Sequence, residues 1–234
     1  MSFSVLVTGA SRGIGRAIAL ELAESGCRVA LVARRAEPLD RVAAEVEALG
    51  GRAWTFPCDL TDTRALSALV DGAAGALGGL DALVNNAGAF DFTPAPEADL
   101  ARWDALLDLN LRAVLHLTRH ALPHLQARER SAVINIASMA GKDPVVGGGA
   151  YCATKFGLFG FGGALFQDVR SRGVKVCTIG PGQASRVDHA PPLDAGLVPG
   201  RDVARVVRFV LEFPATSCPT EILLRAQHPA PSQP

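Results

Sequence analysis

Residues 3–15 read Phe3-Ser4-Val5-Leu6-Val7-Thr8-Gly9-Ala10-Ser11-Arg12-Gly13-Ile14-Gly15, and this stretch decides the fold. Its first half is a short apolar run of the length of a buried strand. Its second half is a glycine-rich turn, and the segment that follows places Ile18 and Leu22 on one helical face before it stops at Ser25-Gly26. A helix that starts on such a turn presents bare backbone N–H groups, which bind a pyrophosphate well. The spacing is Gly-x-x-x-Gly-x-Gly, and an ordinary tight turn is the alternative interpretation.

The rest of the chain alternates between strand patterns and helix patterns. Further short apolar runs predict strands at 28–33, 53–57, 80–84, 132–137, 174–179 and 221–224. The segments between them predict helices at 38–49, 62–77, 99–126, 150–171 and 202–212. This alternation predicts an α/β fold, a doubly wound parallel sheet of the Rossmann type with helices on both faces. We expect a single domain over residues 1–227, a disordered tail at 228–234, and a ligand site beyond the carboxyl ends of the strands.

A tyrosine and a lysine stand four residues apart in the second half of the chain. Tyr151 is the only tyrosine, and Lys155 is one of only three lysines. Four residues are about one helical turn, so the two side chains share a face. An ammonium beside a phenol stabilises the phenolate and lowers the tyrosine pKa from its reference of about 10, which equips the phenol to give and take a proton. A buried tyrosine beside a chance surface lysine is the alternative.

Several motifs together resemble those of the short-chain dehydrogenase/reductase family. They are Thr8 to Gly15, Asn85-Asn86-Ala87-Gly88, Ser138 thirteen residues before Tyr151, and Tyr151-x-x-x-Lys155. Asp59-Leu60, Asn110 and Pro181-Gly182 also fall where that family has its cofactor and catalytic contacts. The resemblance extends from about residue 4 to residue 224, and the order and spacing of the motifs make it specific.

The resemblance implies a catalytic set of Asn110, Ser138, Tyr151 and Lys155. In this set, Tyr151 is the general acid in carbonyl reduction and the general base in alcohol oxidation. Lys155 lowers the tyrosine pKa and holds the nicotinamide ribose, and Ser138 hydrogen-bonds the substrate oxygen. Asn110 bends its helix and holds a water in a proton relay to the lysine. A strand-end cap is the alternative for Ser138, and a surface polar residue is the alternative for Asn110.

The same resemblance implies a dinucleotide site. Its residues are Gly9, Ser11, Arg12, Gly13, Ile14, Gly15, Arg34, Arg35, Asp59, Leu60, Asn86, Ala87, Gly88, Tyr151, Lys155, Pro181 and Gly182. NAD-selective enzymes place an acidic residue at the end of the second strand, where this chain has Ala33. Arg34 and Arg12 instead suit the 2′-phosphate of NADP, so we expect NADPH to be preferred over NADH. A solvated arginine pair is the alternative, and ordinary helix capping is the alternative to an adenine contact for Asp59.

Two departures from the family pattern concern the cofactor and the substrate. Arg186 stands where the family has the threonine that contacts the nicotinamide carboxamide, and Ser185 is the candidate substitute. The following segment, 189–200, is short and rich in proline where many relatives carry a helical lid over the substrate. Both departures put the firmness of cofactor binding and the closure over substrate in question.

The helix predicted at 150–171 suggests self-association. It carries four interior glycines and bulky apolar residues nearly all round, among them Phe156, Phe161 and Phe166. Such a helix needs a second apolar neighbour, and a partner subunit supplies one. We therefore expect a homo-oligomer, a tetramer or a dimer, paired through the helices 99–126 and 150–171, as the resemblance also implies. The alternative is that the extra apolar face packs on the helix 99–126 of the same chain.

Composition excludes some classes of function. The formal net charge is zero, so no basic surplus drives binding to nucleic acid or to an anionic membrane. No apolar run reaches the length of a membrane span, and the N-terminus lacks a signal-peptide pattern. The five cysteines are scattered without metal-binding spacing, so we expect buried thiols in a reducing cytoplasm and no metal site.

The motifs favour an NADPH-dependent oxidoreductase that reduces a small-molecule ketone to an alcohol, or catalyses the reverse. A narrower alternative is a 3-oxoacyl-thioester reductase, in which Arg128, Arg130 and Arg172 face an acidic carrier protein; a solvated basic rim fits these arginines equally well. A second alternative is a non-catalytic NADP-binding sensor on the same fold. The complete catalytic set argues against the sensor, whereas Arg186 leaves it open.

Overall fold

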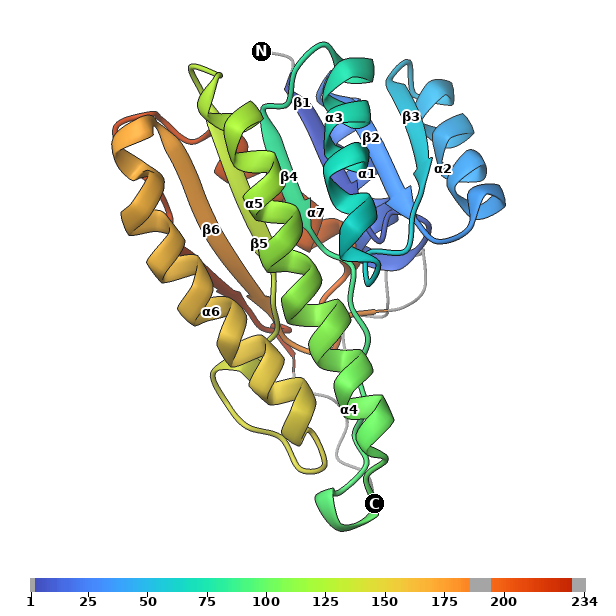
Figure 1. Ribbon diagram of the computed structural model, residues 1–234, viewed down its shortest axis with the longest axis vertical. Coiled ribbons are helices and arrows are strands. Elements are labelled where there is room, and N and C mark those ends of the chain that lie inside the picture. The colour runs from blue at the N-terminus through green and yellow to red at the C-terminus, as the bar shows by residue number, and fades with distance from the viewer. Residues whose placement is uncertain (1–2, 186–194, 229–234) are drawn as a thin grey trace.

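The computed structural model describes residues 3–185 and 195–228, which form a parallel sheet of seven strands (Figure 1). The strands are β1 (Ser4–Thr8), β2 (Arg28–Ala33), β3 (Arg52–Pro57), β4 (Ala82–Asn85), β5 (Ser131–Ile136), β6 (Val174–Pro181) and β7 (Glu221–Leu224). Their order in the sheet is β3-β2-β1-β4-β5-β6-β7, and every neighbouring pair is parallel. The order reverses between β1 and β4, which is where open α/β sheets bind their ligands. The predicted doubly wound parallel sheet is confirmed.

Helices cover both faces of the sheet (Figure 1). One face carries α1 (Gly13–Glu24), α2 (Ala36–Ala48) and α7 (Gly200–Glu212). The other carries α3 (Leu66–Leu77), α5 (Ala113–Gln126) and α6 (Gly149–Val169). Two layers of helices bury both faces of the strands, which is why the strands read as almost continuous apolar runs.

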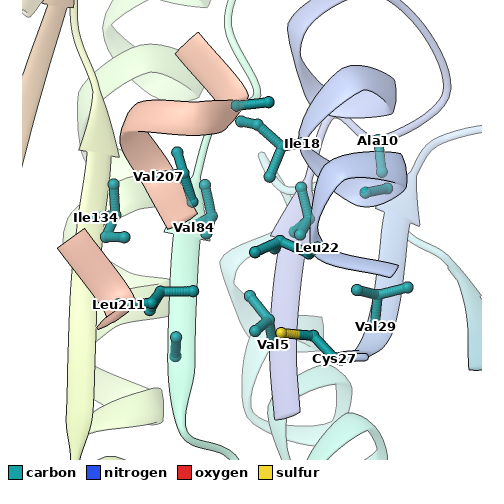
Figure 2. Close-up of a cluster of buried hydrophobic side chains, with 14 of the residues drawn as sticks. Val5, Ala10, Ile18, Leu22, Cys27, Val29, Val84, Ile134, Val207 and Leu211 are labelled. Carbon is teal, nitrogen blue, oxygen red and sulfur yellow. The ribbon is translucent and has the colours of Figure 1, made fainter. Parts of the chain in front are cut away.

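The side chains of β1 alternate between two cores. Val5 and Val7 pack in the core beneath α1, α2 and α7, whereas Leu6 packs in the core beneath α3, α5 and α6. In the first core, Leu22 of α1 and Leu211 of α7 approach the strands from the same side (Figure 2). All of these side chains are fully or almost fully buried, and each contributes about 1.5–3 kcal/mol relative to an exposed position. The cores hold the carboxyl ends of the strands in register.

The helix predicted at 99–126 is interrupted. It consists of α4 (Leu100–Leu107), a π-helical segment η3 (Asp108–Arg112), and α5. A π-helical turn accommodates an additional residue and redirects the side chains near it, and such turns are frequent at functional sites. Asn110 lies at the centre of this segment.

The other predicted helices differ from the structure mainly at their ends. The helix expected from residue 62 begins as a short 3₁₀ turn (Thr63–Ala65) that Asp62 caps, and only then continues as α3. In the part of the chain that the structure describes, no helix is long and apolar enough to cross a membrane. Of the tail predicted as disordered, residues 229–234 lie outside the described residues.

Most phenylalanines of α6 do not lie on the open apolar face that the sequence suggested. Phe161 and Phe166 are partly buried and pack against the core of their own chain. Only Phe156 stays substantially exposed, at 43%. Gly157 lies under Leu111 of η3, because a Cβ on this glycine would be 3.1 Å from a Leu111 methyl carbon. The predicted alternative, packing within the chain, therefore accounts for much of this helix.

Candidate active site

The glycine turn after β1 is tied to the end of β4. The Thr8 hydroxyl donates to the Val84 carbonyl oxygen, at 3.2 Å. The same hydroxyl oxygen accepts from the backbone N–H groups of Asn86 (2.9 Å) and Ala87 (3.0 Å). The Asn86 side-chain amide donates to the Thr8 carbonyl oxygen, at 2.8 Å. These bonds lock the two strands together at the point where the strand order reverses.

Two glycines of this turn are required by close packing. A Cβ on Gly15 would lie 2.2 Å from the Gly9 carbonyl oxygen and 2.5 Å from the Asn86 amide nitrogen. A Cβ on Gly9 would lie 2.9 Å from the Ala87 Cα, and the φ of Gly9 is +64°. The backbone segments can approach each other this closely only because Gly9 and Gly15 have no side chains.

The N-terminus of α1 is open. A Cβ on Gly13 would meet nothing within 4 Å, and Arg12 forms no side-chain cap on the helix. The first N–H groups of a helix have no partner within the helix. The partial positive charge at this end therefore faces open space and can receive an anionic group.

Exposed arginines surround this helix end. Arg12 precedes α1, and Arg34 and Arg35 follow β2. None of the three side chains forms a hydrogen bond or an ion pair with another residue in 3–185 or 195–228. Their guanidinium groups remain available to an anion.

Asp59, just beyond β3, lies within the electrostatic reach of these arginines. Its pKa is lowered, first by hydrogen bonds from the Thr61 backbone N–H (3.0 Å) and hydroxyl (2.8 Å), and further by the charge of Arg34. The cap of the following 3₁₀ turn is Asp62. The capping interpretation of Asp59 is therefore wrong, and its carboxylate forms a local turn with Thr61.

Tyr151 and Lys155 lie close together at the start of α6, as their spacing predicted. The Lys155 Nζ is 5.7 Å from the centroid of the Tyr151 ring. It donates to the Ile136 carbonyl oxygen at the end of β5, at 3.1 Å. Lys155 is only 5% exposed, and this burial lowers its pKa from 10.5 to about 8. The alternative of a chance surface lysine is wrong.

The pKa of Tyr151 moves opposite to the prediction. Burial raises it above the ordinary value of 10, while a hydrogen bond with the Ser138 side chain acts to lower it. The expectation that Lys155 lowers this pKa is wrong for this structure, because the removal of water from the phenol is the largest influence. The protonated phenol is therefore the favoured form at neutral pH.

Ser138 stands directly after β5 and has two partners. Its side chain hydrogen-bonds to Tyr151. Its Oγ also accepts from the Ala140 N–H, at 3.1 Å, and so caps the short 3₁₀ helix η4 (Met139–Gly141). The capping role, predicted as the alternative, is present together with the contact to the phenol, and it holds the hydroxyl in position.

Asn110 connects the interrupted helix to the loop after β4. Its Oδ1 accepts from the Ala89 N–H and its Nδ2 donates to the Ala89 carbonyl oxygen, both at 2.8 Å. The Nδ2 also donates to the Thr154 hydroxyl, at 3.3 Å. A Cβ on Gly88 would lie 3.2 Å from the Asn110 Oδ1 and 3.7 Å from the Lys155 Nζ, so the loop backbone passes beside both groups. The surface interpretation of Asn110 is wrong, because this residue is 1% exposed.

The remaining predicted residues lie along the same edge of the sheet. Leu60 is buried just beyond β3. Pro181 ends β6, and the N–H of Gly182 donates to the Leu224 carbonyl oxygen of β7, at 2.8 Å. Ser185 is buried, whereas Arg186 and the segment up to residue 194 lie outside the described residues.

Three residues next to the site, Thr8, Thr154 and Phe92, are missing from the predicted set. Thr8 carries a signal in the sequence, because a hydroxyl residue separates the apolar run from the first glycine. Thr154 precedes Lys155 and donates to the Tyr151 carbonyl oxygen, at 2.7 Å. Phe92 meets the Tyr151 ring edge to face, with centroids 5.6 Å apart. No pattern in the sequence signals that contact, since it depends on the conformation of a loop.

The sequence and the fold resemble those of known proteins. The family model described as short chain dehydrogenase matches residues 4–195. Serine 3-dehydrogenase of Agrobacterium fabrum is 38% identical over 184 residues, which cover 78% of this chain and 72% of that protein. The 3-oxoacyl-acyl-carrier-protein reductase FabG of Staphylococcus aureus is 36% identical over 183 residues, which cover 78% of this chain and 74% of that protein. A solved structure of a metagenomic short-chain oxidoreductase in complex with NADP has a TM-score of 0.84 at 39% identity. The match covers 95% of this chain and 96% of that chain.

Proposed function

This chain belongs to the short-chain dehydrogenase/reductase family, and we propose that it is an NADPH-dependent oxidoreductase that reduces a carbonyl to an alcohol, or catalyses the reverse. One observation carries the proposal. The partly buried Ser138 and Tyr151, with the buried Lys155, and the open N-terminus of α1 both lie at the carboxyl edge of the sheet. The first can move a proton, and the second can bind the pyrophosphate of a dinucleotide.

The turn after β1 fits the dinucleotide. The glycine contacts leave room for a phosphate against the backbone, and the N–H groups at the start of α1 would donate to it. Arg12 and Arg34 would hold a 2′-phosphate, which supports NADPH over NADH. The NADP complex of the metagenomic relative supports the same choice. When bound, the cofactor supplies the hydride of the reaction.

The protein's own residues would handle the proton. In reduction, Tyr151 would donate its phenolic proton to the carbonyl oxygen as negative charge develops there. Ser138, already hydrogen-bonded to the phenol, would donate to the same oxygen and stabilise that charge. Lys155 would offset the charge left on the phenolate. The raised pKa of Tyr151 keeps the proton in place until the substrate needs it.

The narrower alternative, a 3-oxoacyl-thioester reductase, gains support from the FabG relative and loses support from the arginines. Arg128 pairs with Asp81 at 2.5 Å, and Arg130 donates to the Phe213 carbonyl oxygen at 3.3 Å. Both precede β5, at the edge of the sheet opposite to the one that carries Tyr151. A carrier protein bound there would not deliver its thioester to the phenol.

A substrate screen tests the proposed function. NADPH oxidation is followed at fixed protein concentration with neutral ketones, with a 3-oxoacyl thioester, and with no substrate. We expect turnover of at least one neutral ketone above the rate without substrate. Turnover of the thioester alone would favour the narrower reductase. NADPH binding without turnover of any carbonyl compound would favour the sensor and overturn the proposal.

We also propose that the chain forms a homo-oligomer through α4, α5 and α6. Leu107 (40%), Leu115 (37%) and Phe156 (43%) are exposed on these helices. A surface cavity of about 440 Å³ next to them is lined by residues of α4, η3 and α5, including Leu111 and His116. A second copy would cover this apolar surface.

Light scattering at micromolar concentration tests this assembly. We expect a dimer or a tetramer for the wild type and a monomer for Phe156→Glu. Leu49→Glu, at an exposed leucine next to α2, is the matched control and should leave the assembly unchanged. A wild-type mass near 24.4 kDa would contradict the proposal.

A cytoplasmic location is proposed on the state of the cysteines. All five are free, and Cys27, Cys152 and Cys177 are buried. Burial raises the pKa of the Cys177 thiol to about 12, which keeps it in the unreactive protonated form. Free thiols of this kind are typical of a reducing compartment. Fractionation of the cells that make the protein tests this location.

A further inference from the structure

Three aromatic rings, those of Phe90, Phe92 and Tyr151, form a ladder that leads from the surface to the candidate catalytic phenol. The rings of Phe90 and Phe92 are stacked with centroids 5.7 Å apart, and Phe92 meets Tyr151 edge to face at 5.6 Å. Phe90 is 48% exposed and Phe92 is 50% exposed. Water therefore covers large apolar surfaces directly beside the partly buried Tyr151, and this is surface that a ligand can cover.

The loop that carries the ladder is held from both ends. The preceding residue, Ala89, is bound through both its N–H and its carbonyl by the Asn110 amide. Asp91 accepts from the Thr93 backbone N–H (3.2 Å) and hydroxyl (2.8 Å). The two phenylalanines are thus ordered before any ligand arrives, which reduces the entropy lost on binding.

The loop before α6 extends the apolar surface. A Cβ on Gly147 would lie 2.3 Å from the Phe92 carbonyl oxygen, so the two loops touch backbone to backbone. Next to this contact, Val145 is 42% exposed and Val146 is 95% exposed. Exposed valines on one loop and exposed phenylalanines on the other therefore adjoin the contact between the two loops.

The charged side chains of this second loop are paired away from the ladder. Lys142 pairs with Glu221 of β7 at 2.7 Å, and Asp143 pairs with Arg225 at 2.7 Å. The carboxylate in the ladder loop, Asp91, is turned towards Thr93 and would repel an anionic substrate. Among the described residues, Lys155 is the cation that lies over the Tyr151 ring.

We propose that Phe90 and Phe92 bind the body of the substrate, and that this substrate is a neutral carbonyl compound with an aryl or bulky hydrocarbon group beside the carbonyl. The proposal rests on the proposed function, because Tyr151 must act on the carbonyl oxygen. Phe92 is half exposed and its ring meets the Tyr151 ring edge to face, so part of its exposed apolar surface lies near the phenol. An apolar group packed on this surface would bring its carbonyl towards the phenolic hydroxyl, which makes Phe92 a specificity-determining residue.

The test compares two ketones that differ in one group. The kcat/KM for acetophenone and for butan-2-one is measured with NADPH for the wild type, Phe92→Ala and Phe90→Ala. The matched control is Phe209→Ala on α7, because Phe209 is 49% exposed and also meets another ring, Phe213, edge to face at 5.1 Å. We expect the wild type to prefer acetophenone. Phe92→Ala should lower the kcat/KM for acetophenone about 10- to 100-fold, chiefly by raising KM. It should change the kcat/KM for butan-2-one less than about threefold.

The outcomes separate a binding role from a structural one. If Phe92 only supports Tyr151, both ketones lose kcat alike in Phe92→Ala, and the proposal is overturned. Phe90→Ala provides a second measurement should Phe92→Ala fail to fold, because Phe90 stacks on the Phe92 ring; an unchanged preference for acetophenone in this variant also overturns the proposal. Turnover of butan-2-one without preference for acetophenone removes the substrate class and leaves the proposed function intact. The absence of turnover with any ketone removes the proposed function itself.

Discussion

The two halves of the candidate site are built in different ways. On the cofactor side, the turn between β1 and α1 is defined by backbone contacts, and a single added Cβ at Gly15 would lie 2.2 Å from a carbonyl oxygen. On the substrate side, the ladder of Phe90, Phe92 and Tyr151 leaves half of each phenylalanine exposed. The difference teaches that one half accepts only one backbone shape, whereas the other half offers a surface whose side chains can vary. We therefore expect geometry to constrain the recognition of the cofactor, and apolar area to constrain the choice of substrate.

The largest expected effect comes from removing the proton donor that lies between the two halves. Tyr151→Phe removes the phenolic proton but keeps the ring that packs against Phe92. Turnover of an accepted ketone should fall by a factor of about 10²–10⁴, with NADPH binding nearly unchanged. Steady-state rates and a cofactor titration measure the two effects. A variant that kept most of the wild-type rate would show that another group supplies the proton.

The next effect breaks the cofactor side by geometry alone. Gly15→Ala forces a clash with the Gly9 carbonyl, which should cost about 1–3 kcal/mol of unfolding free energy and weaken NADPH binding at least about tenfold. Gly163→Ala is the matched control, because a Cβ there meets nothing within 4 Å on α6. The control should stabilise the protein by up to about 1 kcal/mol, since glycine disfavours a helix. Thermal unfolding and cofactor titration of both variants decide, and equal behaviour would contradict the packing argument.

A third prediction concerns the buried ammonium at the junction. The folded-state pKa of Lys155, about 8, is below its ordinary 10.5, so the charged form destabilises the fold by about 3 kcal/mol at neutral pH. Lys155→Met should therefore raise stability at pH 7 by about 1–2 kcal/mol, because the lost bond to the Ile136 carbonyl offsets part of the gain. Turnover of an accepted ketone should also fall.

The pH dependence gives this prediction its sign. Between pH 8 and 10.5 the unfolded chain binds more protons than the folded protein, so wild-type stability rises through that window relative to the variant. The advantage of Lys155→Met should be complete below pH 8 and should disappear towards pH 10.5. Urea unfolding at pH 7 and pH 10 measures it, and a gap that stays constant would show that the buried charge is not its cause.

The smallest expected effect tests the choice between NADPH and NADH without changing the backbone of the cofactor side. Arg34→Ala removes one exposed guanidinium that forms no hydrogen bond or ion pair with another described residue. NADPH binding should weaken about tenfold, whereas NADH binding should change little, because only NADPH carries the 2′-phosphate. Dissociation constants of both cofactors measure this, with Arg64→Ala, an arginine paired with Asp62, as the control. Equal or tighter binding of NADH by the wild type would contradict the preference.

Much of the fold and part of the site follow from local patterns. Apolar runs of strand length and the glycines after them predict the parallel sheet, and the spacing of Tyr151 and Lys155 predicts their shared face. Local patterns do not predict the interruption of the helix at 108–112, and only the family resemblance implied that Asn110 bends this helix; in the structure Asn110 is hydrogen-bonded there to the distant Ala89. Phe161 and Phe166 were expected on an open helix face, yet they pack on their own core. Periodicity shows that a side chain is apolar, but it does not identify its neighbour.

The sequence by itself determined which elements form, that they make a doubly wound parallel sheet, and that the glycine turn and Tyr151 lie at its carboxyl edge. These properties depend on local backbone preferences and on the alternation of strand and helix, which a linear chain carries in full. Only the tertiary structure decided the direction of the Tyr151 pKa, the pairing of Arg128 with Asp81, and the ladder through Phe92. Each of these depends on how segments that are distant in the sequence pack against one another. A sequence states which chemical groups the side chains carry, whereas folding sets the distances between these groups and their exposure to water.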